Sequence, residues 1–141
     1  MRKGLALIVV LGVMLAACAE PSEEASADPT EVAWSLESGT LNDEEIPIVE
    51  DHPITLVFDE GTVGGASGCN TYFGGYTIEG TAISFSDMGS TMMACEPAEV
   101  MDSETMYLAA MADVSQFSAT DDSLTLTGEG VELNFVVDDA A

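Results

Sequence analysis

The residues best suited to covalent or metal chemistry in this chain are its three cysteines, Cys18, Cys69 and Cys95. A reactive or metal-binding thiolate needs partners such as His or Lys, and the one histidine, His52, stands beside a proline in a predicted loop. Cys69 and Cys95 form an even pair in a region that we expect to be exported, where two cysteines ordinarily oxidise. We therefore predict a disulfide between Cys69 and Cys95; a metal or catalytic thiol pair is the alternative.

Cys18 stands at the end of a secretory signal pattern. Arg2 and Lys3 precede an apolar run over residues 5–15, which is shorter than the roughly 20 residues of a membrane-spanning helix. The run ends in Leu-Ala-Ala before Cys18, an order that resembles the lipobox of bacterial lipoproteins, where the thiol is acylated, for example with palmitate. We predict a signal peptide over residues 1–17 and a membrane anchor on the Cys18 lipid. An ordinary signal peptide with an incidental cysteine is the alternative.

The residues after Cys18 indicate a destination and a tether. Ala19, rather than Asp, follows the cysteine, and by resemblance to Gram-negative sorting this favours the outer membrane, facing the periplasm. Residues 18–31 contain no large apolar side chain, so we expect the acylated cysteine to be followed by a disordered acidic linker. The folded domain is then predicted over residues 32–138.

The charge of the chain excludes whole classes of partner. Asp and Glu number 26 against 2 Lys and Arg, and both basic residues lie in the predicted signal. Such a surface repels nucleic acid, and the mature chain would offer no lysine nucleophile or arginine clamp. We expect diffuse association of cations but no metal site and no cofactor, and we interpret the acidity as an adaptation of solubility to an ion-rich setting.

The periodicity of the apolar residues predicts the strands and the helix that could position these residues. Apolar residues recur with period two, which is typical of antiparallel strands with one buried face; examples are the segments 32–36, 54–58, 83–85, 124–126 and 131–137. One segment, about residues 97–112, has helical spacing and begins at a proline with acidic neighbours. The pattern predicts a mainly β domain, a sheet or partial barrel with one packed helix.

Three motifs then resemble a known family. They read Gly68-Cys69-Asn70-x-Tyr72-x-Gly74-x-Tyr76, Ser90-Thr91-Met92-Met93-Ala94-Cys95 and Glu104-x-x-Tyr107-Leu108-x-x-Met111. In this order they resemble the META domain, the family of HslJ-like heat-shock lipoproteins, over about residues 32–137. The resemblance implies an open or cracked antiparallel β-barrel with one helix, and links the chain to envelope stress without an agreed activity. It also implies a structural or ligand-binding role for the motif residues Gly68, Asn70, Met93, Ala94 and Glu104. Met92 departs from the Arg that the family often places there, so no role that needs a cation carries over.

Glu104 is the most unusual of these residues. Helical spacing places its carboxylate on the same face as Val100, Tyr107 and Met111, where an unpaired charge is costly. No Lys or Arg can pair with it, so its partners are N–H groups or hydroxyls, for which the 68–70 loop is the candidate source. The alternatives are a protonated carboxyl, a side chain that reaches water, or a ligand contact.

Catalytic and copper sites are weaker interpretations. The glycines between Gly64 and Gly75 lack both a phosphate-loop pattern and a nucleophile-elbow pattern, and instead suit a bulge or a close approach of backbone. Met88, Met92, Met93 and Cys95 could ligate Cu(I), but methionines more commonly fill a core. We therefore predict a non-enzymatic, stress-related module that binds a protein partner. The alternative is a carrier or sensor with a small apolar or lipid ligand in the barrel mouth.

Overall fold

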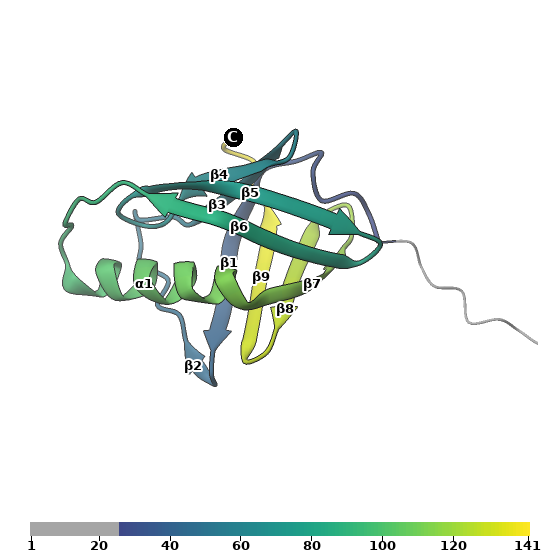
Figure 1. The fold of residues 1–141 in the computed structure, drawn as a ribbon. Helices are drawn as coiled ribbons and strands as arrows, with labels where there is room; N and C mark the ends of the chain where they lie inside the picture. The colour runs from purple at the N-terminus through teal and green to yellow at the C-terminus, as the bar shows by residue number, and fades with distance from the viewer. Residues whose placement is uncertain (1–25) are drawn as a thin grey trace, which may run out of the picture.

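The computed structural model describes residues 26–141, so the predicted signal peptide, Cys18 and most of the predicted tether lie outside the described residues. The described chain folds into one antiparallel sheet and one helix (Figure 1). In chain order the elements are β1 (Trp34–Leu41), β2 (Glu44–Glu45), β3 (Thr55–Asp59), β4 (Thr62–Ala66), β5 (Thr71–Glu79), β6 (Ala82–Ser90), α1 (Ala98–Asp113), β7 (Val114–Ala119), β8 (Ser123–Gly128) and β9 (Val131–Val137). Within this part of the chain, none of the helical structure is long and apolar enough to cross a membrane.

The sheet closes on itself. β1 pairs with β3 and also with β9, so β1 and β3 to β9 form a closed antiparallel barrel, while β2 adds a short strand outside the ring. The ring closes weakly at two seams: β1 and β3 share two Cα pairs, and β6 and β7 share one, Ala82 opposite Gln116. The predicted fold class, a cracked antiparallel barrel with one packed helix, is confirmed, and the short seams are where the barrel is cracked.

The interior of the barrel is filled by the period-two residues of the strands. Trp34 is 1% exposed, Tyr72 0% and Phe135 2%, and the remaining core residues pack around them. β3, β8 and β9 bury every second side chain, and this alternation gives one core and one wetted face. Buried leucines from β1, β3, β8 and β9 complete the core: Leu36, Leu56, Leu124, Leu126 and Leu133.

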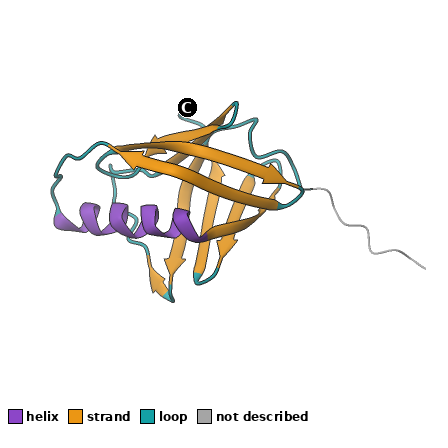
Figure 2. Cartoon of the chain, in the orientation of Figure 1, coloured by secondary structure: helices purple, strands orange, loops and turns teal. Residues whose placement is uncertain are grey.

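Helix α1 packs against β1, β6 and β9 and covers one side of the barrel (Figure 2). It begins one residue later than predicted, because Pro97 has extended rather than helical backbone angles and is the N-cap. It also ends one residue later, at Asp113. Its buried side presents Val100, Glu104, Tyr107 and Met111 to the strands, as the helical spacing predicts.

Strand β4 and one packed segment were not expected from the periodicity. β4 contains adjacent glycines, Gly64 and Gly65, and a Cβ at Gly65 would collide with the carbonyl of Thr55. The glycines therefore allow a close approach of backbone within a strand, which hides the strand from a period-two search. Residues 26–31, the last part of the predicted tether, lie against the barrel, where the Trp34 indole N–H donates to the Pro29 carbonyl at 2.8 Å.

Candidate functional site

Glu104 on α1 is held by three hydrogen bonds in a buried pocket of polar groups. Its side chain is 6% exposed. One carboxylate oxygen accepts from the Ser67 hydroxyl at 2.6 Å and from the Asn70 backbone N–H at 2.8 Å, and the other accepts from the Asn70 side-chain amide at 2.6 Å. The described residues contain no Lys or Arg, so hydrogen bonds alone compensate the burial of this carboxylate.

Asn70 carries the same network into the loop between β6 and α1. Its side-chain oxygen accepts from the Met93 N–H at 2.7 Å and from the Thr91 hydroxyl at 3.0 Å. Its amide also donates to the Met93 carbonyl at 3.1 Å. Asn70 therefore ties the helix, through Glu104, to the backbone of the Met93 loop.

The turn that presents Asn70 depends on Gly68. Gly68 has φ +98°, a left-handed conformation that favours glycine, and a Cβ there would lie 3.5 Å from the Val100 side chain. The His52 ring nitrogen Nδ1 lies 3.3 Å from the Gly68 carbonyl. Gly68 thus has a backbone role in this turn.

The predicted disulfide is confirmed. Cys69 and Cys95 are bonded, with their Cα atoms 5.7 Å apart and a sequence separation of 26. The bond joins the turn that carries Asn70 to the loop that precedes α1. Ala94, by contrast, is exposed in this loop.

The structure thus brings together Cys69, Asn70, Met93, Cys95 and Glu104, which the sequence singled out. Sequence reasoning missed Ser67 and Thr91 as partners. Their signal is weak: Ser67 stands next to one motif and Thr91 lies within another, and only the fold shows which hydroxyl faces Glu104 or Asn70.

This cluster offers little catalytic chemistry. Ser67 is the one hydroxyl bonded to the Glu104 carboxylate, but it is 0% exposed, so a substrate has no access to it. Among the described residues no group of three His, Cys, Asp or Glu side chains could hold a metal ion. The geometry is that of a structural clamp between helix, turn and loop.

A second polar contact lies inside the barrel itself. The Tyr72 hydroxyl donates to the Thr55 carbonyl at 2.7 Å and lies 2.8 Å from the Tyr107 hydroxyl. Burial raises the pKa of both tyrosines well above its ordinary value. Both phenols are therefore neutral hydrogen-bonding groups of the core.

Large apolar side chains that the barrel does not bury are found on its outside. Across the strands, Val57 of β3, Gly64 of β4, Phe73 of β5 and Gly89 of β6 stand opposite one another in register. Phe73 is 56% exposed and Val57 42%, and the glycines between and beside them carry no side chain to cover them.

The loop after β6 adds two methionines to this end of the β5–β6 pair. Met92 is 96% exposed and Met93 63%. The Thr91 N–H donates to the Thr71 carbonyl, two residues from Phe73 along β5. We call Val57, Phe73, Met92 and Met93 the outer apolar patch.

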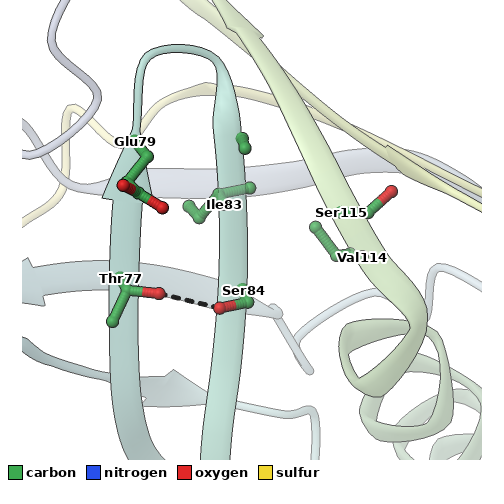
Figure 3. A pocket seen from close by; sticks show the side chains of 7 residues that line it. Thr77, Glu79, Ile83, Ser84, Val114 and Ser115 are labelled. Carbon is green, nitrogen blue, oxygen red and sulfur yellow. Dashed lines mark hydrogen bonds between the residues drawn. The ribbon is translucent and has the colours of Figure 1, made fainter.

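The surface also has a groove at the β6–β7 seam (Figure 3). It has a volume of about 210 Å³ and lies between Ile83 and Ser84 on one side and Val114 and Ser115 on the other. A wider depression of about 530 Å³ borders residues 26–30 and the β5–β6 turn. Both lie on the surface, outside the filled core.

Comparison with known proteins supports the fold and matches the chain to one family. A family model described as the META domain matches residues 27–140. Among curated proteins, none matches this chain.

Solved structures with the same fold are more distant. A Burkholderia xenovorans protein solved by NMR is 25% identical, covers 85% of this chain and 97% of its own length, and has a TM-score of 0.68. A second NMR structure is 18% identical, covers 77% of this chain and 90% of its own, and has a TM-score of 0.60. A crystal structure of a DUF4847 family protein from Bacteroides vulgatus is 12% identical, covers 79% and 96%, and has a TM-score of 0.55. The last two show similarity of fold alone.

Proposed function

The chain belongs to the META domain family, and we propose that it is a non-catalytic, stress-related interaction module of the bacterial cell envelope that works by binding a protein partner. The observation that carries the proposal is that some large apolar side chains fill the barrel interior while others are exposed on its outer surface. The barrel interior is occupied by its own side chains, while Phe73, Met92 and Met93 are exposed on the outside. Exposed apolar groups that gather on one surface are typical of protein contacts.

The lipid anchor supplies the location in this proposal. Cys18 follows the lipobox-like Leu-Ala-Ala, and an acyl chain adds about 0.8 kcal/mol of membrane affinity per buried CH₂. We propose attachment to the outer membrane with the domain facing the periplasm, because Ala19 follows the cysteine. In that position the outer apolar patch would meet other envelope proteins.

A carrier or sensor of a small apolar ligand is the competing function. It requires an apolar cavity, and such sites commonly measure about 300–1,000 Å³ and enclose most of the ligand. The depression of about 530 Å³ beside residues 26–30 reaches this size, but Asp28, Thr30 and Thr77 line it together with Tyr76 and Ile78. A lipid retained by the purified protein would favour this function.

Photo-cross-linking tests the proposal. A benzoylphenylalanine in place of Phe73 should give discrete cross-linked protein species in intact cells. The matched control replaces Val136 on β9, which is 38% exposed and lies across the barrel from β5. We expect cross-links from position 73 and none of the same mass from position 136.

The anchor has its own control in the same experiment. Cys18→Ser should leave the protein unacylated, and the cross-links should be lost if the partner resides at the membrane. The absence of protein cross-links from Phe73, together with a lipid retained in native mass spectrometry, would contradict the interaction module and support the carrier.

A further inference from the structure

We propose that Met92 and Met93 are a reversible oxidation switch: conversion of their two thioethers to sulfoxides releases the protein partner from the outer apolar patch. This inference rests on the proposed function, since it names a regulation of the surface that the interaction module uses. The chemistry that modifies the site is that of a small neutral oxidant, with hypochlorous acid as the example tested below.

Exposure separates these two methionines from the others in the described part of the chain. Met92 is 96% exposed and Met93 63%. The other methionines of residues 26–141 are buried or half-buried: Met88, Met101, Met106 and Met111. An oxidant must reach the sulfur atom to react with it, so it meets Met92 and Met93 before the others.

The backbone of this loop is fixed although its side chains are exposed. The loop joins β6 to α1 at one end of the molecule (Figure 1). The Met93 N–H donates to the Asn70 side-chain oxygen at 2.7 Å, and the Met93 carbonyl accepts from the Asn70 amide at 3.1 Å. Before it, the Thr91 N–H donates to the Thr71 carbonyl at 3.0 Å, and after it the disulfide joins the loop to the turn before β5. The two methionine side chains are thus held at a fixed place on the surface.

Oxidation at these positions changes the surface and leaves the core intact. A sulfoxide is polar and a thioether is apolar, so oxygen added to Met111, which is 0% exposed, would place a polar group in the core. At Met92 and Met93 the added oxygen faces water, and the hydrogen bonds that hold Met93 are made by its backbone. The fold should therefore persist, while the outer apolar patch loses two of its apolar side chains.

The reaction with hypochlorous acid balances at each sulfur. The thioether gives up two electrons and takes the oxygen atom, the chlorine leaves as chloride, and one proton is released. Cys69 and Cys95 are bonded to one another, so neither offers a thiol that would consume the oxidant first. The formal net charge of −24 repels anionic oxidants, which favours a neutral one. A methionine sulfoxide reductase returns the thioether, and this makes the switch reversible.

Peptide mapping tests the order of oxidation. The full-length protein in detergent is treated with limiting hypochlorous acid and digested with a protease that cuts after acidic residues, because the described domain has no Lys or Arg for trypsin. We expect sulfoxide at Met92 first and at Met93 next, with Met111 unmodified. Fragment spectra of the peptide that follows Asp87 distinguish Met88 from these two. Oxidation of a half-buried methionine before Met92 and Met93 would overturn the proposal.

Urea unfolding of the same sample tests whether the switch acts at the surface. Protein that carries oxygen only on Met92 and Met93 should unfold at the same urea concentration as untreated protein. A lower midpoint would show that oxidation acts by unfolding the domain, and would overturn the proposal.

A matched pair of double variants tests the effect on the partner, with cross-linking from position 73 in intact cells as the measurement. Met92→Leu with Met93→Leu keeps the patch apolar but cannot form a sulfoxide, so its cross-links should persist with and without oxidant. Met92→Gln with Met93→Gln imitates the polarity of the sulfoxides, so its cross-links should be lost without oxidant. The unaltered methionines should give cross-links that are lost on oxidation. Loss of cross-links from the leucine variant on oxidation would assign the effect to the partner and overturn the proposal.

The same measurement distinguishes failure of the switch from failure of the proposed function. If cross-links from position 73 persist after both methionines are oxidised, or persist in the glutamine variant, the switch fails and the interaction module stands. If the untreated protein gives no cross-links from position 73, the interaction module itself fails, and the switch fails with it.

Discussion

At the scale of single residues, Glu104 and Asn70 explain why two distant motifs occur in one chain. The Glu104 carboxylate on the helix accepts hydrogen bonds from the backbone and the side chain of Asn70. The Asn70 side chain in turn accepts from the Met93 N–H and donates to the Met93 carbonyl. Each hydrogen bond supports the geometry of the next, so removal of one member leaves the others with unsatisfied buried groups.

Glu104→Gln should therefore destabilise the fold. Glutamine keeps the size of the side chain, but its NH₂ group would face a donor, either the Ser67 hydroxyl or the Asn70 amide. The expected loss is about 1–3 kcal/mol in the free energy of unfolding, measured by urea titration. Glu99→Gln, in the exposed first turn of the same helix, is the control and should change little. Equal stability of the two variants would argue against a structural clamp.

The buried tyrosine pair predicts a loss of stability at high pH. Burial raises the pKa of Tyr72 and Tyr107 in the folded state above the ordinary value of about 10 in the unfolded chain. The folded state then holds more protons above pH 10, so the free energy of unfolding is unaffected below that pH and falls as pH rises above it. Urea titrations from pH 8 to pH 12 measure this slope. Tyr107→Phe removes one of the groups and should make the fall shallower; an unchanged slope would contradict the assignment.

At the scale of elements, the disulfide and the hydrogen bonds of Asn70 both link the turn before β5 to the loop before α1. The turn before β5 and the loop before α1 are joined by the covalent bond between Cys69 and Cys95 and by the hydrogen bonds of Asn70 to Met93. The loop is otherwise exposed, so these links hold it on the barrel.

Replacing both cysteines by serine should lower the stability substantially. The bond closes a loop of 26 residues, and the chain-entropy model gives about 3.5 kcal/mol for a loop of that length. Urea unfolding of the double variant measures the loss, and reduction of the unaltered protein should reproduce it. Two reactive thiols in the unreduced protein, or unchanged stability, would contradict this prediction.

At the scale of the whole molecule, charge opposes folding and burial supports it. The chain has a formal net charge of −24, and its two basic residues lie outside the described domain, which therefore has no Lys or Arg for an ion pair. Stability must come from the filled barrel core, the hydrogen-bonded clamp and the disulfide, against repulsion between carboxylates.

Salt should therefore raise the melting temperature. Increasing NaCl from 0.1 M to 1 M shortens the Debye length from about 10 Å to about 3 Å and screens the repulsion. Calorimetry in NaCl and KCl measures the effect, and an equal rise in the two salts indicates screening rather than a specific ion site. A melting temperature that is flat or falls would count against the interpretation of the acidity as an adaptation to ions.

The sequence alone sufficed for the properties that depend on local order and composition. Period-two and helical spacing predicted most strands and the helix, because the alternation of buried and exposed side chains is a property of each element. The pairing of Cys69 with Cys95 and the burial of Glu104 were predicted from residue types and spacing in the same way.

The tertiary structure alone decided what depends on contacts between distant segments. The closure of the ring by β1 with β9, the short seam between β6 and β7 and the choice of Ser67 as a partner of Glu104 all require the register of strands that are far apart in sequence. The strand at Gly64 and Gly65 was hidden for a related reason, since glycines there serve a close contact with β3 rather than a periodic pattern. Local periodicity says which face of an element is buried, but it does not say which neighbour buries it or which edge is left open.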